Sequence, residues 1–74
     1  MKEYNGHRSW NAWNVSLWIN NDEWLYRYGR YCLRRANGKP GLAARLFMRY
    51  LKDEKTPDGA VYNHLAVKLA LTDD

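Results

Sequence analysis

Eight basic side chains lie between positions 27 and 52, and this segment contains no Asp or Glu. Arginine pairs bidentately with phosphate and carboxylate groups, so the segment predicts a site for an anionic partner, either a nucleic acid or an acidic protein surface. The candidate binding residues are Arg27, Arg30, Arg34, Arg35, Lys39, Arg45, Arg49 and Lys52, with Tyr26 and Tyr31 as stacking or hot-spot contacts. The alternative is a solvated face that only keeps the protein soluble.

Residue types that carry out catalysis or bind metals are sparse. The two histidines, His7 and His64, lie far apart in the sequence, and no Cys/His cluster has the spacing of a zinc site. Cys32 lacks a His or Asp partner at a spacing typical of a nucleophile, so we interpret it as a small core residue. The segment 38–41 does not have the spacing of a phosphate-binding P-loop. We therefore expect no enzymatic activity, no metal and no cofactor.

The segment Ser9–Asn21 holds three of the four tryptophans and is the most apolar part of the chain's first half. At 100° per residue its Trp and Leu side chains occupy one face, while an Ala, a Val and an Ile occupy nearly the opposite one. A helix that is apolar on two sides is usually buried between neighbours. We predict a helix from about Trp10 to Asn20, capped by Ser9, that forms the hydrophobic centre of the fold.

Two asparagines, Asn11 and Asn14, interrupt the apolar faces of this helix. Buried polar groups need hydrogen-bond partners, so we expect both side chains to fix the packing of the helix against its neighbours. A role in a binding surface is the alternative interpretation.

A second helix is predicted from about Asp22 to Ala36, with Asn21 as its N-cap. Gly29 lies inside this helix and costs about 1 kcal/mol relative to Ala, which is tolerable if a neighbouring helix approaches closely there. The pair Asn37-Gly38 is typical of a left-handed helix end.

A third helix is predicted from about Pro40 to Lys55, with Tyr50 on its buried face. The segment 56–59 then has two interpretations. In one, Thr56 caps a fourth helix directly; in the other, the segment forms a β-turn and the helix begins near Tyr62. If the second and third helices pack as a hairpin, their basic stripes merge into one patch.

Length and composition predict a single all-α domain over residues 1–74, a small bundle of three to four helices with a Trp-rich central helix. At 74 residues the hydrophobic core is thin, and four Trp and six Tyr are the natural compensation. One cysteine excludes an internal disulfide and fits a reducing compartment. The N-terminal residues are polar, and no apolar run reaches the ~20 residues that span a membrane. We expect a protein of the bacterial cytoplasm with no membrane partner.

From Tyr4 to Tyr26 the chain reads YNGHRSWNAWNVSLWINNDEWLY. This stretch resembles a family of small proteins of bacteriophages and mobile elements with the pattern Y-N-G, an aromatic residue, and W-N-V-x-L-W-[IL]-x-N-D-E-x-L-Y. The segment 56–59, TPDG, is a second and looser match, whereas the basic segment 27–52 is not part of the pattern. The resemblance carries no functional residues over. It implies a phage or prophage setting, in which small proteins often inhibit host defence, as anti-CRISPR proteins do.

Three functional hypotheses follow from the sequence. The first is a binding protein that inhibits a host defence nucleoprotein complex by steric blockade through the basic patch. The second is direct binding of DNA or RNA by the same patch, with an affinity that falls steeply with salt. The third is a homodimer formed through a partly exposed Trp-rich face.

Overall fold

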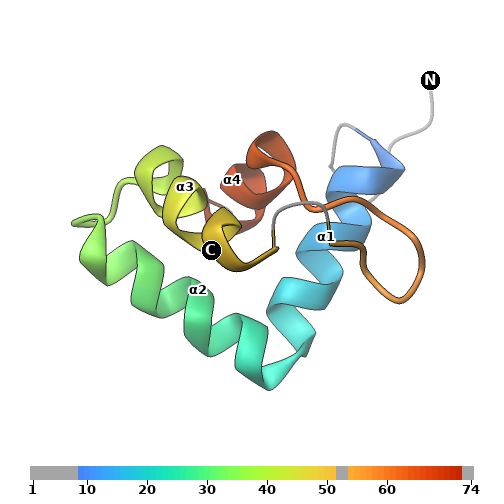
Figure 1. The fold of residues 1–74 in the computed structure, drawn as a ribbon, viewed down its shortest axis with the longest axis horizontal. Helices are drawn as coiled ribbons and strands as arrows, with labels where there is room; N and C mark the ends of the chain where they lie inside the picture. The colour runs from blue at the N-terminus through green and yellow to red at the C-terminus, as the bar shows by residue number, and fades with distance from the viewer. Residues whose placement is uncertain (1–8, 52–53, 73–74) are drawn as a thin grey trace.

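The protein is described by a computed structural model over residues 9–51 and 54–72, which form four helices: α1 (Trp10–Asn21), α2 (Glu23–Arg35), α3 (Pro40–Leu51) and α4 (His64–Thr72). Helix α2 lies along one side, α1 and α3 lead away from its two ends, and α4 lies between them (Figure 1). Among the described residues there is no strand, and one isolated β-bridge joins Lys55 to Val61. The predicted all-α fold class is confirmed.

Short polar side chains cap the N-termini of α1 and α2. The Ser9 hydroxyl accepts a hydrogen bond from the Ala12 N–H at 3.1 Å, as predicted. The cap of α2 is Asp22, whose carboxylate accepts from the Leu25 N–H at 3.0 Å. Asn21, the predicted cap, is instead the last residue of α1. Aspartate suits the cap position because its charge also interacts favourably with the helix dipole.

The end of α2 has the predicted left-handed geometry. Asn37 and Gly38 have φ angles of +55° and +80°. The Gly38 N–H donates to the Leu33 carbonyl at 2.8 Å, and the Asn37 N–H donates to the Arg34 carbonyl at 3.2 Å. This pair of bonds is a Schellman motif, which satisfies the last carbonyls of the helix and turns the chain toward α3.

Between α3 and α4 the structure favours the β-turn interpretation. Helix α3 ends at Leu51, before the predicted Lys55. The Gly59 N–H donates to the Thr56 carbonyl at 2.9 Å, which closes a turn over residues 56–59. Helix α4 begins only at His64, two residues later than the expected start near Tyr62.

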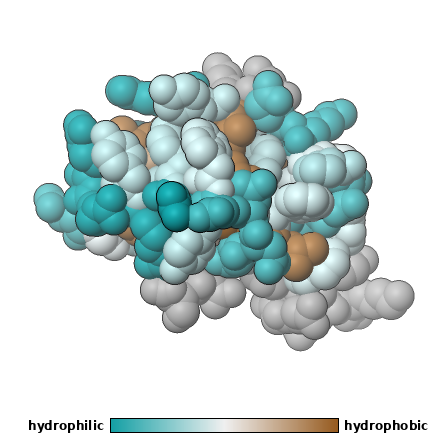
Figure 2. Space-filling view, turned by 90° about the horizontal axis from the view of Figure 1, so that it is seen from below, coloured by the Kyte–Doolittle hydropathy of each residue, from teal (hydrophilic) through white to brown (hydrophobic). Residues whose placement is uncertain are grey.

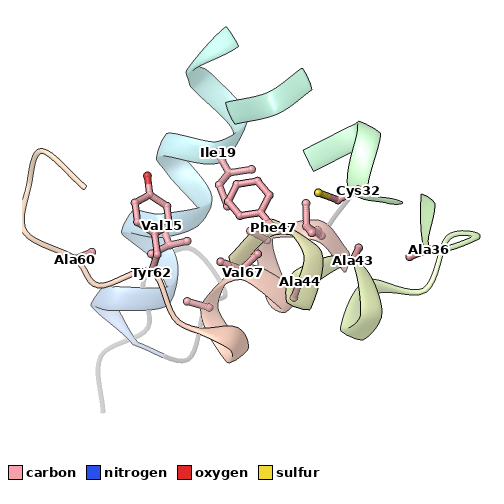
Figure 3. Packing of buried hydrophobic residues seen from close by; sticks show 13 residues of the cluster. Val15, Ile19, Cys32, Ala36, Ala43, Ala44, Phe47, Ala60, Tyr62 and Val67 are labelled. Atoms are coloured by element: carbon pink, nitrogen blue, oxygen red, sulfur yellow. The ribbon is translucent and has the colours of Figure 1, made fainter. Parts of the chain in front are cut away.

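The core is built from a few larger side chains of α1, α3 and α4 and many small ones, and α2 gives it Gly29 and Cys32. Val15, Ile19, Phe47 and Val67 are fully buried, and Figure 3 shows Ile19 against the ring of Phe47. Alanines of α3 and α4 fill the space around them, so the helices approach closely. Gly29 belongs to this contact: a Cβ at this position would lie 2.9 Å from Leu71 Cδ2, so the predicted close approach of a neighbouring helix is confirmed for α4.

The tryptophans do not form the hydrophobic centre, and this expectation was wrong. Helix α1 buries apolar side chains on its opposite face, at Ala12, Val15 and Ile19, whereas on the Trp-bearing face the fully buried residue is Asn14 and Trp10 remains 39% exposed. Trp13 and Trp18 are half-buried. Helix α1 packs against α2 and α4, and the side chains it gives to the core are those of Val15 and Ile19 rather than the indoles.

Candidate functional site

A row of four side chains runs along α2 at positions 24, 28, 31 and 35. The ring centroids of Trp24 and Tyr28 are 5.2 Å apart with planes at 17°, and those of Tyr28 and Tyr31 are 6.1 Å apart at 19°. The Arg35 guanidinium lies over the Tyr31 ring, 5.8 Å from its centroid, and donates to the Tyr31 hydroxyl at 3.1 Å. We call these four residues the aromatic row. Spacings of four, three and four residues place them on one helix face.

Tyr28 joins the aromatic row to α3. Its ring packs against Phe47 at 5.1 Å and meets Tyr50 edge-on at 5.4 Å and 83°. Its hydroxyl donates to the Leu46 carbonyl at 3.2 Å. Burial, followed by the nearby Cys32, raises the pKa of Tyr28 to about 12, so the phenol stays neutral and keeps donating at physiological pH.

A groove of about 270 Å³ lies between α2 and α3 beside the aromatic row. One arginine from each helix, Arg35 and Arg49, borders it. Tyr50 is 71% exposed, which corrects its predicted place on the buried face of the third helix. The full lining comprises Tyr28, Tyr31, Cys32 and Arg35 from α2, and Leu46, Arg49 and Tyr50 from α3.

The structure brings together only part of the predicted basic patch. Arg35 and Arg49 share the groove, whereas Arg45 borders a separate, more open depression with Gly41, Leu42 and His64. Helix α3 packs between α2 and α4. Arg45 and Arg49 are one turn apart on it, so Arg49 borders the groove toward α2 and Arg45 borders the depression toward α4. Arg34, Arg45 and Arg49 make no ion pair with any residue in 9–51 or 54–72.

The remaining predicted residues lie on the outer face of α2, in the loop after it, or beyond the described residues. Arg27 forms an ion pair with Glu23 at 2.6 Å. Arg30 lies over the Tyr26 ring at 5.2 Å, away from the groove. Lys39 is exposed in the loop, and Lys52 falls outside the residues that the structure describes. Figure 2, seen from the side of α2, shows a hydrophilic band with paler residues on both sides of it.

Sequence reasoning missed three residues of this site: Trp24, Tyr28 and Tyr50. The positions 24, 28, 31 and 35 follow the i, i+4, i+7, i+11 pattern of one helix face. That pattern was present in the sequence and predicts the row. For Tyr50 no such signal exists, because its exposure depends on how far α2 covers α3.

A polar network on the other side of the molecule holds the 54–62 loop to α1. Buried Asn14 donates to an Asp58 carboxylate oxygen at 3.0 Å and accepts from the Thr56 hydroxyl at 2.6 Å. The Trp18 indole N–H donates to the same Asp58 oxygen at 2.9 Å. Asn11 exchanges two hydrogen bonds with the backbone of Val61, of 2.7 and 2.9 Å. Both asparagines therefore fix packing, as expected.

This network joins two stretches of the chain that are far apart in the sequence, 4–26 and 56–59. Asn14 and Trp18 belong to the first stretch, and Thr56 and Asp58 belong to the TPDG segment. The hydrogen bonds from Asn14 and Trp18 hold the pKa of Asp58 below its usual range. These hydrogen bonds therefore have a structural role, because they hold the 54–62 loop against α1.

The described residues contain no group of three or more His, Cys, Asp or Glu side chains placed to hold a metal ion. Cys32 is buried, and burial raises the pKa of its thiol, which makes it a weak nucleophile at neutral pH. None of the described helices is long and apolar enough to cross a membrane.

Comparison with known proteins gives a family and nothing more specific. No curated protein and no solved structure matches the chain. A family model matches residues 1–73, which is nearly the whole sequence. The chain therefore belongs to the family described as a family of unknown function, DUF7249.

Proposed function

We propose that this protein is a binding protein rather than an enzyme, and that its groove face docks on an acidic surface of a partner protein. The groove face comprises the aromatic row together with Arg49 and Tyr50. Aromatic residues and arginine are the types enriched at the energetic centres of protein interfaces. The tight packing of Tyr28 holds this face in shape, so little conformational entropy is lost on binding.

The observation that carries the proposal is the pair Arg35 and Arg49 at one groove. Both side chains are exposed, and neither is neutralised by a carboxylate of the described residues. Exposed rings line the same groove, with Tyr31 44% and Tyr50 71% exposed. Uncompensated charge next to exposed aromatic surface favours a partner that supplies both carboxylates and apolar side chains.

The resemblance to phage and mobile-element proteins adds the biological setting. In that setting we propose that the partner belongs to a host defence nucleoprotein complex, and that binding blocks the complex sterically, as anti-CRISPR proteins do. The chain needs no catalytic group for such a role.

A tagged form of the protein, expressed in a bacterial host, tests this proposal. We expect one acidic protein or complex, identified by mass spectrometry, to be captured by the wild type and by Arg45→Glu, but not by Arg49→Glu. The control lies on the same helix, is equally exposed and changes net charge equally, yet it borders the other depression. Equal capture by both variants would refute the proposal.

Direct nucleic-acid binding is the second candidate, and the net charge of +4 with an acid-free segment over residues 27–52 favours it. It predicts a mobility shift of DNA or RNA at low salt, with an affinity that falls linearly with salt on logarithmic axes. The absence of any shift at 50 mM salt would eliminate this candidate.

A further inference from the structure

We infer that the segment which occupies the groove between α2 and α3 is an acidic amphipathic helix of the partner. The inference rests on the proposed function and names the recognition element for it. The aromatic row covers positions 24 to 35, a length of roughly 16 Å at 1.5 Å per residue. A second helix laid beside it presents side chains at the same i, i+4, i+7 spacing, so the two rows match in period.

The groove is small for a typical small-molecule site. At about 270 Å³ it lies below the range of roughly 300–1,000 Å³ that holds drug-sized ligands, and it is open along its side. It therefore fits the side chains of a macromolecule. Among the described residues no sheet offers an edge, so an added β-strand has nothing to pair with.

The orientation of the rings favours a peptide over a nucleic acid. Nucleobases bind proteins by stacking on ring faces. In the aromatic row the rings turn their faces toward one another, and Arg35 lies over Tyr31. Stacking within the row therefore covers ring faces that a nucleobase would need, and the ring edges suit aliphatic and aromatic side chains. Tyr50 also lines the groove but does not belong to this stack, because its ring plane is nearly perpendicular to that of Tyr28.

The two arginines at the groove determine which polar residues the partner helix should carry. Arg35 and Arg49 border the groove from opposite helices, so carboxylates on both flanks of an inserted apolar stripe meet a guanidinium. The matching sequence has Leu, Phe or Met at i, i+4 and i+7, with Asp or Glu at the flanking positions.

A displayed library of randomised 16-residue peptides, selected on the wild-type protein, tests the inference. We expect enrichment of acidic sequences with apolar residues at i, i+4 and i+7. Synthetic copies of the enriched peptides should gain helical circular dichroism on binding. Their affinity should fall at least tenfold for Arg49→Glu and for Tyr50→Ala, and less than twofold for Arg45→Glu. Retained helicity of each variant alone shows that it folds.

Other outcomes overturn the inference in distinguishable ways. Proline-rich or unpatterned peptides whose binding still needs Arg49 would refute the helical partner and leave the groove as the binding site. The helical partner would also be refuted if no peptide were enriched, or if the enriched peptides bound Arg49→Glu and Tyr50→Ala as tightly as they bind the wild type. In either case, capture of a protein partner by the same variants decides whether the groove binds proteins at all. Displacement of the peptides by a 12-nucleotide oligothymidine with higher affinity would assign the groove to single-stranded nucleic acid.

Discussion

Replacing Asn14 by Ala is the most informative change to the fold, because this side chain joins α1 to the 54–62 loop. Asn14 is 2% exposed and accepts a 2.6 Å hydrogen bond from the Thr56 hydroxyl, which is itself buried. Removing it leaves that hydroxyl without this acceptor, at a cost of about 1–3 kcal/mol. The lost hydrogen bond to Asp58 adds to this cost. We therefore expect a loss of about 2 kcal/mol or more in the free energy of unfolding.

For a domain of this size, about 2 kcal/mol corresponds to a fall in Tm of roughly 8–16 °C. Thermal and urea unfolding followed by tryptophan fluorescence measures the effect. Asn20→Ala is the matched control, since that exposed side chain bonds only to Ser16 in its own helix. Equal stability of the two variants would contradict the structural role assigned to the network.

Three further changes test other parts of the fold. Gly29→Ala gains helix propensity but places a Cβ 2.9 Å from Leu71 Cδ2, so we expect urea unfolding to show a net loss of about 1 kcal/mol in the free energy of unfolding. A gain in stability would show that α4 can shift to accommodate the methyl group. Asn37→Ala puts an alanine at φ +55° and should cost about 1 kcal/mol, whereas Asn37→Gly should not. The pKa of Asp58 is lowered from 3.8 in the folded state, so its contribution is present above the unfolded-state pKa and is lost as the pH falls through the lower folded-state pKa. Asp58→Asn should make Tm fall less steeply as the pH is lowered. An unchanged slope on the acid side of the Tm-against-pH curve would refute the stabilising role of the Asp58 carboxylate.

Local signals in the sequence were sufficient for most of the helix boundaries. Ser9 as a cap, Asn37-Gly38 as a left-handed end and Gly29 as a point of close approach each act within a few residues, and each was predicted correctly. The cap of α2 was misassigned by one residue because Asn21 and Asp22 are both good caps and only the geometry of the turn selects between them.

The packing of α1 and the grouping of the arginines depend on tertiary contacts that the sequence does not contain. Both faces of α1 are apolar, so periodicity alone cannot identify the face that enters the core; in the structure it is the face of Ala12, Val15 and Ile19. Arg45 and Arg49 share a stripe in the sequence but border different depressions, because α3 has α2 on one side and α4 on the other. The binding role of these residues stays a prediction, and the sequence alone could not show which arginines border the same groove.

The dissociation constant of the captured partner, measured for three purified proteins, tests the central claim most directly. The proteins are the wild type, the groove double variant Arg35→Glu/Arg49→Glu, and the control double variant Arg34→Glu/Arg45→Glu. Each double variant lowers the net charge from +4 to 0, because each substitution removes one positive charge and adds one negative charge. We predict a loss of about 100-fold or more for the groove variant, from two hot-spot contacts of about 2 kcal/mol each, and a loss within about threefold for the control, from general electrostatic steering alone. Equal losses for both would show that only net charge matters and would contradict a groove-centred site.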